Sequence, residues 1–204
     1  MDEDQRETVR TGYDDIAATY TAERDGDGRE RRLLTDLSAA LPAGSRVLDA
    51  GCGAGTPALD VVVGDHAVTG LDISREQLRS AGARLPDSLF CQGDLAALPF
   101  VDDTFDALVS LHAVIHVPRA EHAAVFAEFE RVLAPGGRLL AALGNEEWEG
   151  NNDDWLDTGT EMAWSFHGRE RNRELLTDAG FTVTDVEVVD DELGGAFAFF
   201  RARA

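Results

Sequence analysis

The sequence predicts a doubly wound α/β protein, with a mostly parallel sheet, helices on both faces and an antiparallel hairpin at its C-terminal end. Strand and helix patterns alternate from residue 47 onward, which is typical of a parallel sheet covered on both sides. A glycine-dense turn at 51–55 leads from the first strand into a helix. Residues 181–188 and 196–202 resemble strands and have no helix between them, so we expect them to pair antiparallel. The 204 residues fit a single domain, 1–204.

Two helices are expected in residues 1–42, before the first strand. Segment 8–20 carries apolar and aromatic residues three or four positions apart, which is typical of one helix face. These residues are Val9, Tyr13, Ile16, Ala17 and Tyr20. Leucines line one face of a second helix at 29–41, which Pro42 ends. The tyrosine-bearing face fits two roles equally well, packing on the sheet or covering a ligand pocket.

Strands and helices then alternate up to residue 180. Two residue pairs are typical of helix starts. One is Thr56 with Pro57, and the other is Ser74 with Gln77 three positions later, which forms a capping-box pattern. The expected strands are 47–50, 68–71, 89–92, 105–111 and 138–143. The expected helices are 56–63, 74–84, 119–133 and 170–179, the last of them stopped by Gly180.

Polar residues gather at the ends of the expected strands. In an open parallel sheet, ligands bind beyond the carboxyl ends of the strands. Asp49, Asp72, Asp94 and Ser110 all lie at such ends. Asp72 is the most informative, because an acidic residue that closes the second strand can accept hydrogen bonds from two ribose hydroxyls at once.

The spacing of the glycine turn separates two kinds of cofactor site. A dinucleotide site needs G-x-G-x-x-G, and here Gly55 is followed by Thr56 and Pro57, so the last glycine is missing. With Asp49 before Gly51, Gly53 and Gly55, the stretch resembles the first motif of the class I S-adenosylmethionine-dependent methyltransferases. Three further segments match that family in order and spacing: 68–72, 91–95 and 131–140. The resemblance covers roughly residues 46–143.

The resemblance implies a Rossmann-like, seven-stranded methyltransferase fold and S-adenosyl-L-methionine as the cofactor. It implies that Asp72 binds the ribose, that Ile73 packs on adenine, and that Asp94 and the Leu95 N–H recognise the adenine edge. It also implies that Asp49 and the backbone carbonyls of Gly51 and Ser110 surround the methionine end. The remaining residues implied at the cofactor are Cys52 and Gly53, with Tyr13 and Tyr20 on the segment that covers the cofactor pocket.

Histidines are the candidates for a general base. The sulfonium of the cofactor already makes its methyl carbon electrophilic, so a base is optional. Any of His112, His116 and His167 could take a proton near neutral pH, and the sequence does not choose among them. His112 and His116 have H-x-x-x-H spacing, but no intervening glutamate and no third ligand lie near them in sequence, so we expect no metal site.

The segment 144–168 is the candidate lid over the methyl acceptor. It holds all three tryptophans, Trp148, Trp155 and Trp164, together with Met162. Aromatic rings at a cleft mouth suit a small organic acceptor. We expect a long functional loop here, since loops of this length are unusual in compact domains. The alternative is an ordinary connection whose rings cover the sheet edge.

The composition is acidic and contains no lysine. The formal net charge is −21, and all 18 basic residues are arginines. We expect a halophilic protein, because screening by salt removes most of the repulsion between carboxylates. The charge argues against nucleic acid as a partner. No apolar run approaches a membrane span, no signal peptide is recognisable, and two cysteines suggest reduced thiols, so we expect a cytoplasmic enzyme.

The leading hypothesis is direct, in-line methyl transfer from S-adenosylmethionine to a small molecule. The alternatives are a nicotinamide-dependent oxidoreductase and a cofactor-binding regulatory domain without turnover. The sequence does not identify the acceptor or the methylated atom, and both a monomer and a homodimer remain open.

Overall fold

One seven-stranded sheet organises the chain. The computed structural model describes residues 2–23, 28–55, 58–62, 64–191 and 194–204. The strand order is β3-β2-β1-β4-β5-β9-β8, and β6 and β7 form a separate two-stranded sheet. The strands are β1 Arg46–Ala50, β2 Ala67–Asp72, β3 Leu89–Gln92, β4 Phe105–Leu111, β5 Leu133–Gly144, β6 Trp148–Trp155, β7 Thr160–Phe166, β8 Thr182–Asp190 and β9 Ala196–Arg203. The helices are α1 Asp2–Glu23, α2 Gly28–Ala39, α3 Ala58–Val62, α4 Arg75–Arg84, α5 His122–Val132 and α6 Arg169–Asp178, with 3-10 turns η1 Val114–His116 and η2 Arg119–Glu121.

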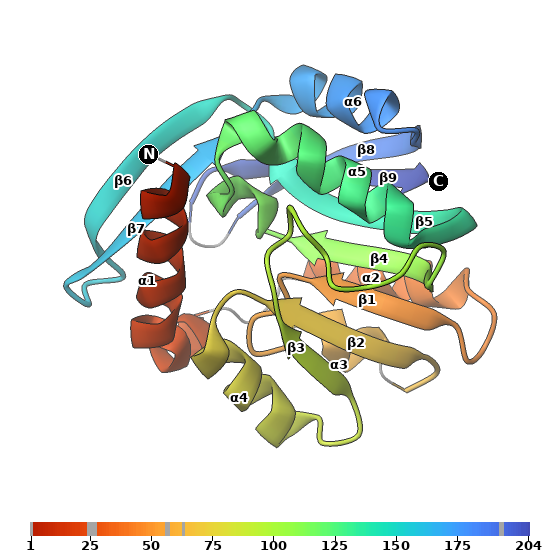
Figure 1. Cartoon of the computed structure of the whole chain (residues 1–204), viewed down its shortest axis with the longest axis horizontal. Coiled ribbons are helices and arrows are strands. Elements are labelled where there is room, and N and C mark those ends of the chain that lie inside the picture. The colour runs from red at the N-terminus through yellow and green to blue at the C-terminus, as the bar shows by residue number, and fades with distance from the viewer. Residues whose placement is uncertain (1, 24–27, 56–57, 63, 192–193) are drawn as a thin grey trace.

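The predicted fold class is confirmed. Strands β3, β2, β1, β4 and β5 are parallel, and β9 pairs antiparallel with both β5 and β8. The hairpin expected from the two helix-free segments therefore forms the edge of the main sheet beside β5 (Figure 1). Gly180 follows α6 with a φ of +112°, so the helix stops before the hairpin where it was predicted to stop.

Helices bury both faces of the sheet, because alternate residues of each strand point to opposite sides. Leu48 and Leu108 pack with Phe126 and Phe129 of α5 in one core. Val47, Ala107 and Val109 face the other side and pack with leucines and valines of α2 and α3, namely Leu33, Leu34, Leu59 and Val62. No helix among the described residues is long and apolar enough to cross a membrane.

Some predicted boundaries were wrong in detail. The helix expected at 119–133 is a 3-10 turn followed by α5. The strand expected at 138–143 begins earlier, since Leu133 pairs with Phe105 and the ladder resumes at Arg138 after a bulge. Ser74 caps α4 by accepting from Gln77 N, but the Gln77 side chain has no hydrogen-bond partner among the described residues, so the capping box is half formed. Thr56 and Pro57 lie outside the described residues.

The segment 144–168 is a β-hairpin and not the long loop that we expected. Strands β6 and β7 pair from Trp148 with Phe166 to Trp155 with Thr160. Its inner side packs on α1 (Figure 1). Met162 and Ala163 of β7 meet Val9 and Ile16 of this helix. A side chain at position 12 would obstruct this packing, since a Cβ on Gly12 would lie 2.8 Å from Met162 Cε and 2.9 Å from the Glu161 carbonyl oxygen.

Candidate functional site

The glycine turn is tied to the carboxyl end of β2. Backbone N–H groups of Gly51 and Cys52 donate to the Leu71 carbonyl oxygen at 2.7 and 2.9 Å. Gly51 has φ +86°, and a Cβ there would lie 2.1 Å from Ala113 Cβ, so only glycine fits. The turn therefore passes close to the segment that follows β4, as a site at the strand ends requires.

Asp72 holds the same turn from the end of β2. Its Oδ2 accepts from Gly53 N and its Oδ1 from Ser74 N, both at 2.8 Å. Burial raises the pKa of Asp72 to about 6, although these backbone donors favour the carboxylate. The carboxylate thus fixes the glycine turn and the start of α4 while lining a cavity.

Asp49 is a buried carboxylate of a different kind. It is 3 % exposed, and it accepts no hydrogen bond from the described residues. Burial, with a smaller contribution from the nearby Asp72 charge, raises the pKa of Asp49 to about 8. An uncompensated carboxylate in such a place is suited to a cationic ligand.

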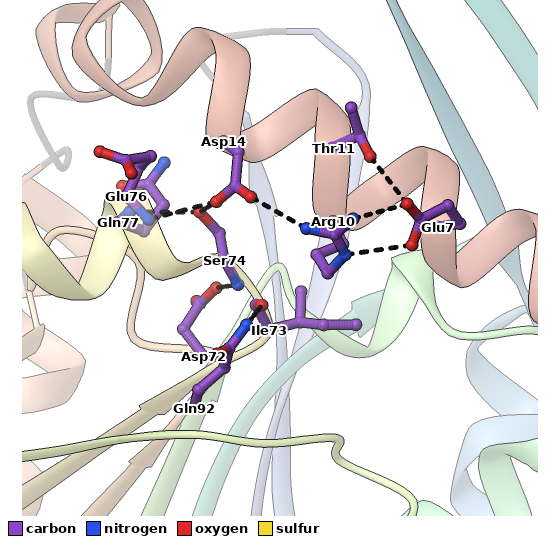
Figure 2. A network of polar contacts seen from close by, with 10 residues as sticks. All are labelled: Glu7, Arg10, Thr11, Asp14, Asp72, Ile73, Ser74, Glu76, Gln77 and Gln92. Carbon is purple, nitrogen blue, oxygen red and sulfur yellow. Dashed lines mark hydrogen bonds and ion pairs between the residues drawn. The ribbon is translucent and has the colours of Figure 1, made fainter.

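Helix α1 is docked over these strand ends by polar contacts (Figure 2). Asp14 Oδ1 accepts from Ser74 Oγ at 2.7 Å and from Glu76 N at 3.2 Å. Arg10 Nη1 donates to the other Asp14 oxygen at 3.1 Å. Ser74 also donates its N–H to Asp72, so the contact with α1 and the carboxylate at the end of β2 share one residue.

Asp94 is also held by α1. Arg6 Nε donates to Asp94 Oδ2 at 2.6 Å, and its guanidinium also pairs with Glu121. Asp94 Oδ1 accepts from Ala96 N at 2.8 Å. Both oxygens are therefore already engaged, and an adenine amine would share them with Arg6.

Three hollows meet beneath α1. The strand-end cavity is lined by Asp72, Ile73, Asp94 and Leu95, among others. The Asp49 pocket adjoins it and is lined by Asp49, Gly51, Cys52, Gly53 and Glu30. The hairpin cavity, of about 780 Å³, lies under β6 and β7 and is lined by Trp148, Trp155, Trp164, Phe166 and Phe197. Tyr20 and His112 line all three, and Tyr13 and His116 line the strand-end and hairpin cavities.

Most of the residues named from the sequence line these hollows, and three do not. Ser110 is fully buried within β4, where its hydroxyl donates to the Ala50 carbonyl oxygen at 2.8 Å. Met162 is fully buried against α1. His167 follows β7 and packs edge-on against His122, with ring centroids 5.3 Å apart. His167 lines none of the three hollows, and burial lowers its pKa.

His112 and His116 point to different partners. His112, at the strained φ of +55°, brings Nε2 to 2.6 Å from Glu30 Oε1 and 3.7 Å from Asp191 Oδ2. Donor atoms of these three residues all lie within 4.8 Å of one another, so they could surround a metal ion. However, two ligands of a tetrahedral metal lie about 3.4 Å apart at bond lengths near 2.1 Å, so the short contact is that of a hydrogen bond. Sequence reasoning missed Glu30 and Asp191, because both are distant from His112 along the chain.

Comparison with known proteins agrees with this geometry. A family model described as a methyltransferase domain matches residues 47–137. A putative methyltransferase of Encephalitozoon cuniculi is 30 % identical over 202 residues, covering 91 % of this chain and 92 % of that protein. A demethylmenaquinone methyltransferase of Renibacterium salmoninarum is 37 % identical over 139 residues, covering 66 % of this chain and 57 % of that protein.

The crystal structure of the 4+2 cyclase SpnF has a TM-score of 0.74 and 25 % identity, covering 95 % of this chain and 94 % of SpnF. The chain spans little more than half, or less, of the length of the first curated relatives that it matches. The glycine turn, the strand order and the near full-length relative together assign the chain to the class I S-adenosylmethionine-dependent methyltransferases.

Proposed function

We propose that this protein transfers a methyl group from S-adenosylmethionine to a small-molecule acceptor. The observation that carries the proposal is Asp49, a buried carboxylate that faces a pocket beside the glycine turn without a hydrogen-bond donor of its own among the described residues. The methionine end of the cofactor carries an ammonium group, which supplies the missing positive charge and N–H donors.

The other contacts follow from the cavities. The ribose hydroxyls would donate to Asp72, whose oxygens each keep lone pairs beside the backbone N–H that they already accept. Adenine would lie in the strand-end cavity between Ile73 and the segment of Asp94 and Leu95. Ser110 would contribute through its backbone, because its hydroxyl is committed to Ala50.

The acceptor would occupy the hairpin cavity. When bound, the cofactor supplies an electrophilic methyl group and a neutral thioether leaving group. The chain would then hold the acceptor in line and exclude water, for which the rings of Trp148, Trp155 and Trp164 provide apolar surface. Relatives named for methylation of demethylmenaquinone and of 27-O-demethylrifamycin SV support a small organic acceptor.

Calorimetry with S-adenosylmethionine and, separately, with NAD tests the cofactor. Transfer of labelled methyl from S-adenosylmethionine to metabolite extracts of the source organism tests the reaction. Binding of NAD without binding of S-adenosylmethionine would overturn the proposal in favour of an oxidoreductase. Cofactor binding without methyl transfer to any extract would indicate a regulatory domain or another reaction on this fold.

A further inference from the structure

A tyrosine and a histidine from distant parts of the chain form a hydrogen-bonded pair where two cavities meet. Tyr13 lies on α1 and His116 ends the 3-10 turn η1 after β4. Tyr13 Oη is 2.8 Å from His116 Nε2, and His116 Nδ1 is 2.8 Å from the Ala163 carbonyl oxygen of β7. The pair thus joins α1, the end of β4 and the hairpin.

The carbonyl fixes the direction of both hydrogen bonds. A backbone carbonyl oxygen can only accept, so Nδ1 of a neutral His116 carries the hydrogen and Nε2 carries the lone pair. Tyr13 therefore donates its hydroxyl hydrogen to His116 Nε2. With that hydrogen committed, any further hydrogen bond at the Tyr13 oxygen is one that the oxygen accepts.

Packing holds the tyrosine ring in place. Tyr13 meets Tyr20, His116 and Trp155 edge-on, with ring centroids 5.1, 5.2 and 5.9 Å apart. His116 is only 7 % exposed and also contacts the ring of Trp164 at 5.6 Å. A tyrosine fixed in this way lines both the strand-end and the hairpin cavity, and so lies between the proposed places of cofactor and acceptor.

The other candidate bases are less well placed. His112 Nε2 is engaged by Glu30, and its Nδ1 is buried with no hydrogen-bond partner among the described residues. His167 lines neither cavity. Only His116 among the three histidines combines a carbonyl-fixed tautomer with a hydrogen bond to a tyrosine that lines both cavities.

We propose that Tyr13 and His116 form a proton relay that serves an aromatic hydroxyl acceptor. This inference rests on the proposed methyl transfer and names its substrate class. As the acceptor oxygen forms its bond to the methyl carbon, the carbon–sulfur bond breaks and its electron pair stays on sulfur. The acceptor proton passes to Tyr13 Oη, and the Tyr13 proton passes to His116 Nε2. His116 ends the step as an imidazolium whose Nδ1–H remains bonded to Ala163, and later releases one proton to water.

The choice of a phenol follows from the cavity and from the relay. An amine or thioether nucleophile can attack without a relay, whereas a neutral hydroxyl is a poor nucleophile until its proton is taken. The hairpin cavity is walled by tryptophan and phenylalanine rings, which favour a planar aromatic ligand by edge and offset contacts.

A phenol series of graded acidity tests the relay. With S-adenosylmethionine, the parent protein should methylate 4-nitrophenol, phenol and 4-methoxyphenol with rates that depend weakly on acidity. Tyr13→Phe and His116→Gln should retain turnover of 4-nitrophenol, which ionises by itself, and lose about 10²-fold or more on 4-methoxyphenol. A structural role would lower all three rates together. Thr11→Ala, which removes an exposed hydroxyl of the same helix outside both cavities, should keep the parental dependence on acidity.

A binding measurement decides the acceptor class without turnover. In the presence of S-adenosylhomocysteine, 4-nitrophenol should bind the parent protein and show more phenolate absorbance than it does free at the same pH, and Tyr13→Phe should abolish that excess. Failure of 4-nitrophenol to bind the cofactor-loaded protein, or equal rate losses for all phenols, would overturn the inference and leave the proposed function intact. Failure to bind S-adenosylmethionine at all would instead overturn the proposed function.

Discussion

Replacing Asp49 by asparagine should stabilise the cofactor-free protein and weaken its cofactor binding. The carboxylate is buried and has no hydrogen-bond donor among the described residues, so its ionised form opposes folding. The difference between the ordinary pKa of 3.8 and the value of about 8 corresponds to roughly 6 kcal/mol at ~1.4 kcal/mol per tenfold change. Relaxation and water entering the adjoining pocket reduce such penalties, so we expect a gain of about 1–3 kcal/mol for Asp49→Asn.

The stabilisation by Asp49→Asn should depend on pH. The pKa of Asp49 is higher in the folded than in the unfolded protein, so the folded state binds the extra proton and stability falls as pH rises between 3.8 and about 8. Asparagine does not titrate. The advantage of Asp49→Asn should therefore be small near pH 5 and largest above about pH 8, reaching roughly 2–10 °C in the thermal midpoint.

Thermal unfolding at fixed KCl concentration, from pH 5 to 9, measures the gain in stability. Calorimetry with S-adenosylmethionine measures the loss of cofactor affinity. Asparagine leaves the cofactor ammonium without a charged partner, so affinity should fall about 10- to 100-fold. Asp87→Asn is the matched control, since this aspartate is exposed in a loop away from the cavities. A midpoint gain that does not grow with pH, together with parental affinity, would refute this account of Asp49.

Three further predictions concern the cofactor, the acceptor and salt. Asp72→Ala should weaken S-adenosylmethionine binding by about 1–3 kcal/mol in calorimetry. Asp60→Ala, which removes an ion pair with Arg84 at 2.5 Å outside the three hollows, should leave that affinity unchanged. Equal losses in the two variants would contradict the proposed binding of the ribose by Asp72. Trp148→Ala should reduce acceptor turnover with unchanged cofactor affinity, because Trp148 lines only the hairpin cavity; a loss of both in equal measure would assign the ring a structural role. The thermal midpoint of unfolding should rise as the KCl concentration is increased from about 0.05 to about 3 M. Added salt screens the net charge of −21, because the Debye length falls from ~30 Å at 0.01 M to ~3 Å at 1 M. A flat or falling midpoint would exclude the halophilic interpretation.

The main sheet was predictable because each of its signals is local. Alternating apolar segments, the glycine turn and the two helix-free terminal strands need no information about distant contacts. The position of Asp72 at a strand end was likewise readable from the chain. The hairpin was not, because β6 is rich in Asn, Asp and Gly, residues that are depleted in strands, and most of its side chains are exposed. Its strand conformation depends on pairing with β7, which in turn packs on α1.

The polar partners of the site were hidden for a related reason. Glu30 lies in a run of charged residues on α2, where nothing distinguishes it from its solvent-facing neighbours. Only the fold brings it to His112, which is 82 positions away. Arg6 and Asp14 are equally ordinary in sequence, and they acquire their roles from Asp94 and from the start of α4. Sequence reasoning therefore finds residues whose backbone position defines the site and misses those that tertiary packing brings to it.

Helix α1 makes the two halves of the site interdependent. Asp14 binds Ser74, which also holds the Asp72 carboxylate of the strand-end cavity, so the docking of α1 and the geometry of that cavity share a hydrogen-bonded chain (Figure 2). On the same helix, Tyr13 binds His116 and meets the ring of Trp155 at the hairpin cavity. A displacement of α1 would therefore disturb both cavities together. Helix α1 lines both cavities, which explains why its tyrosine-bearing face is both packing surface and cavity lining.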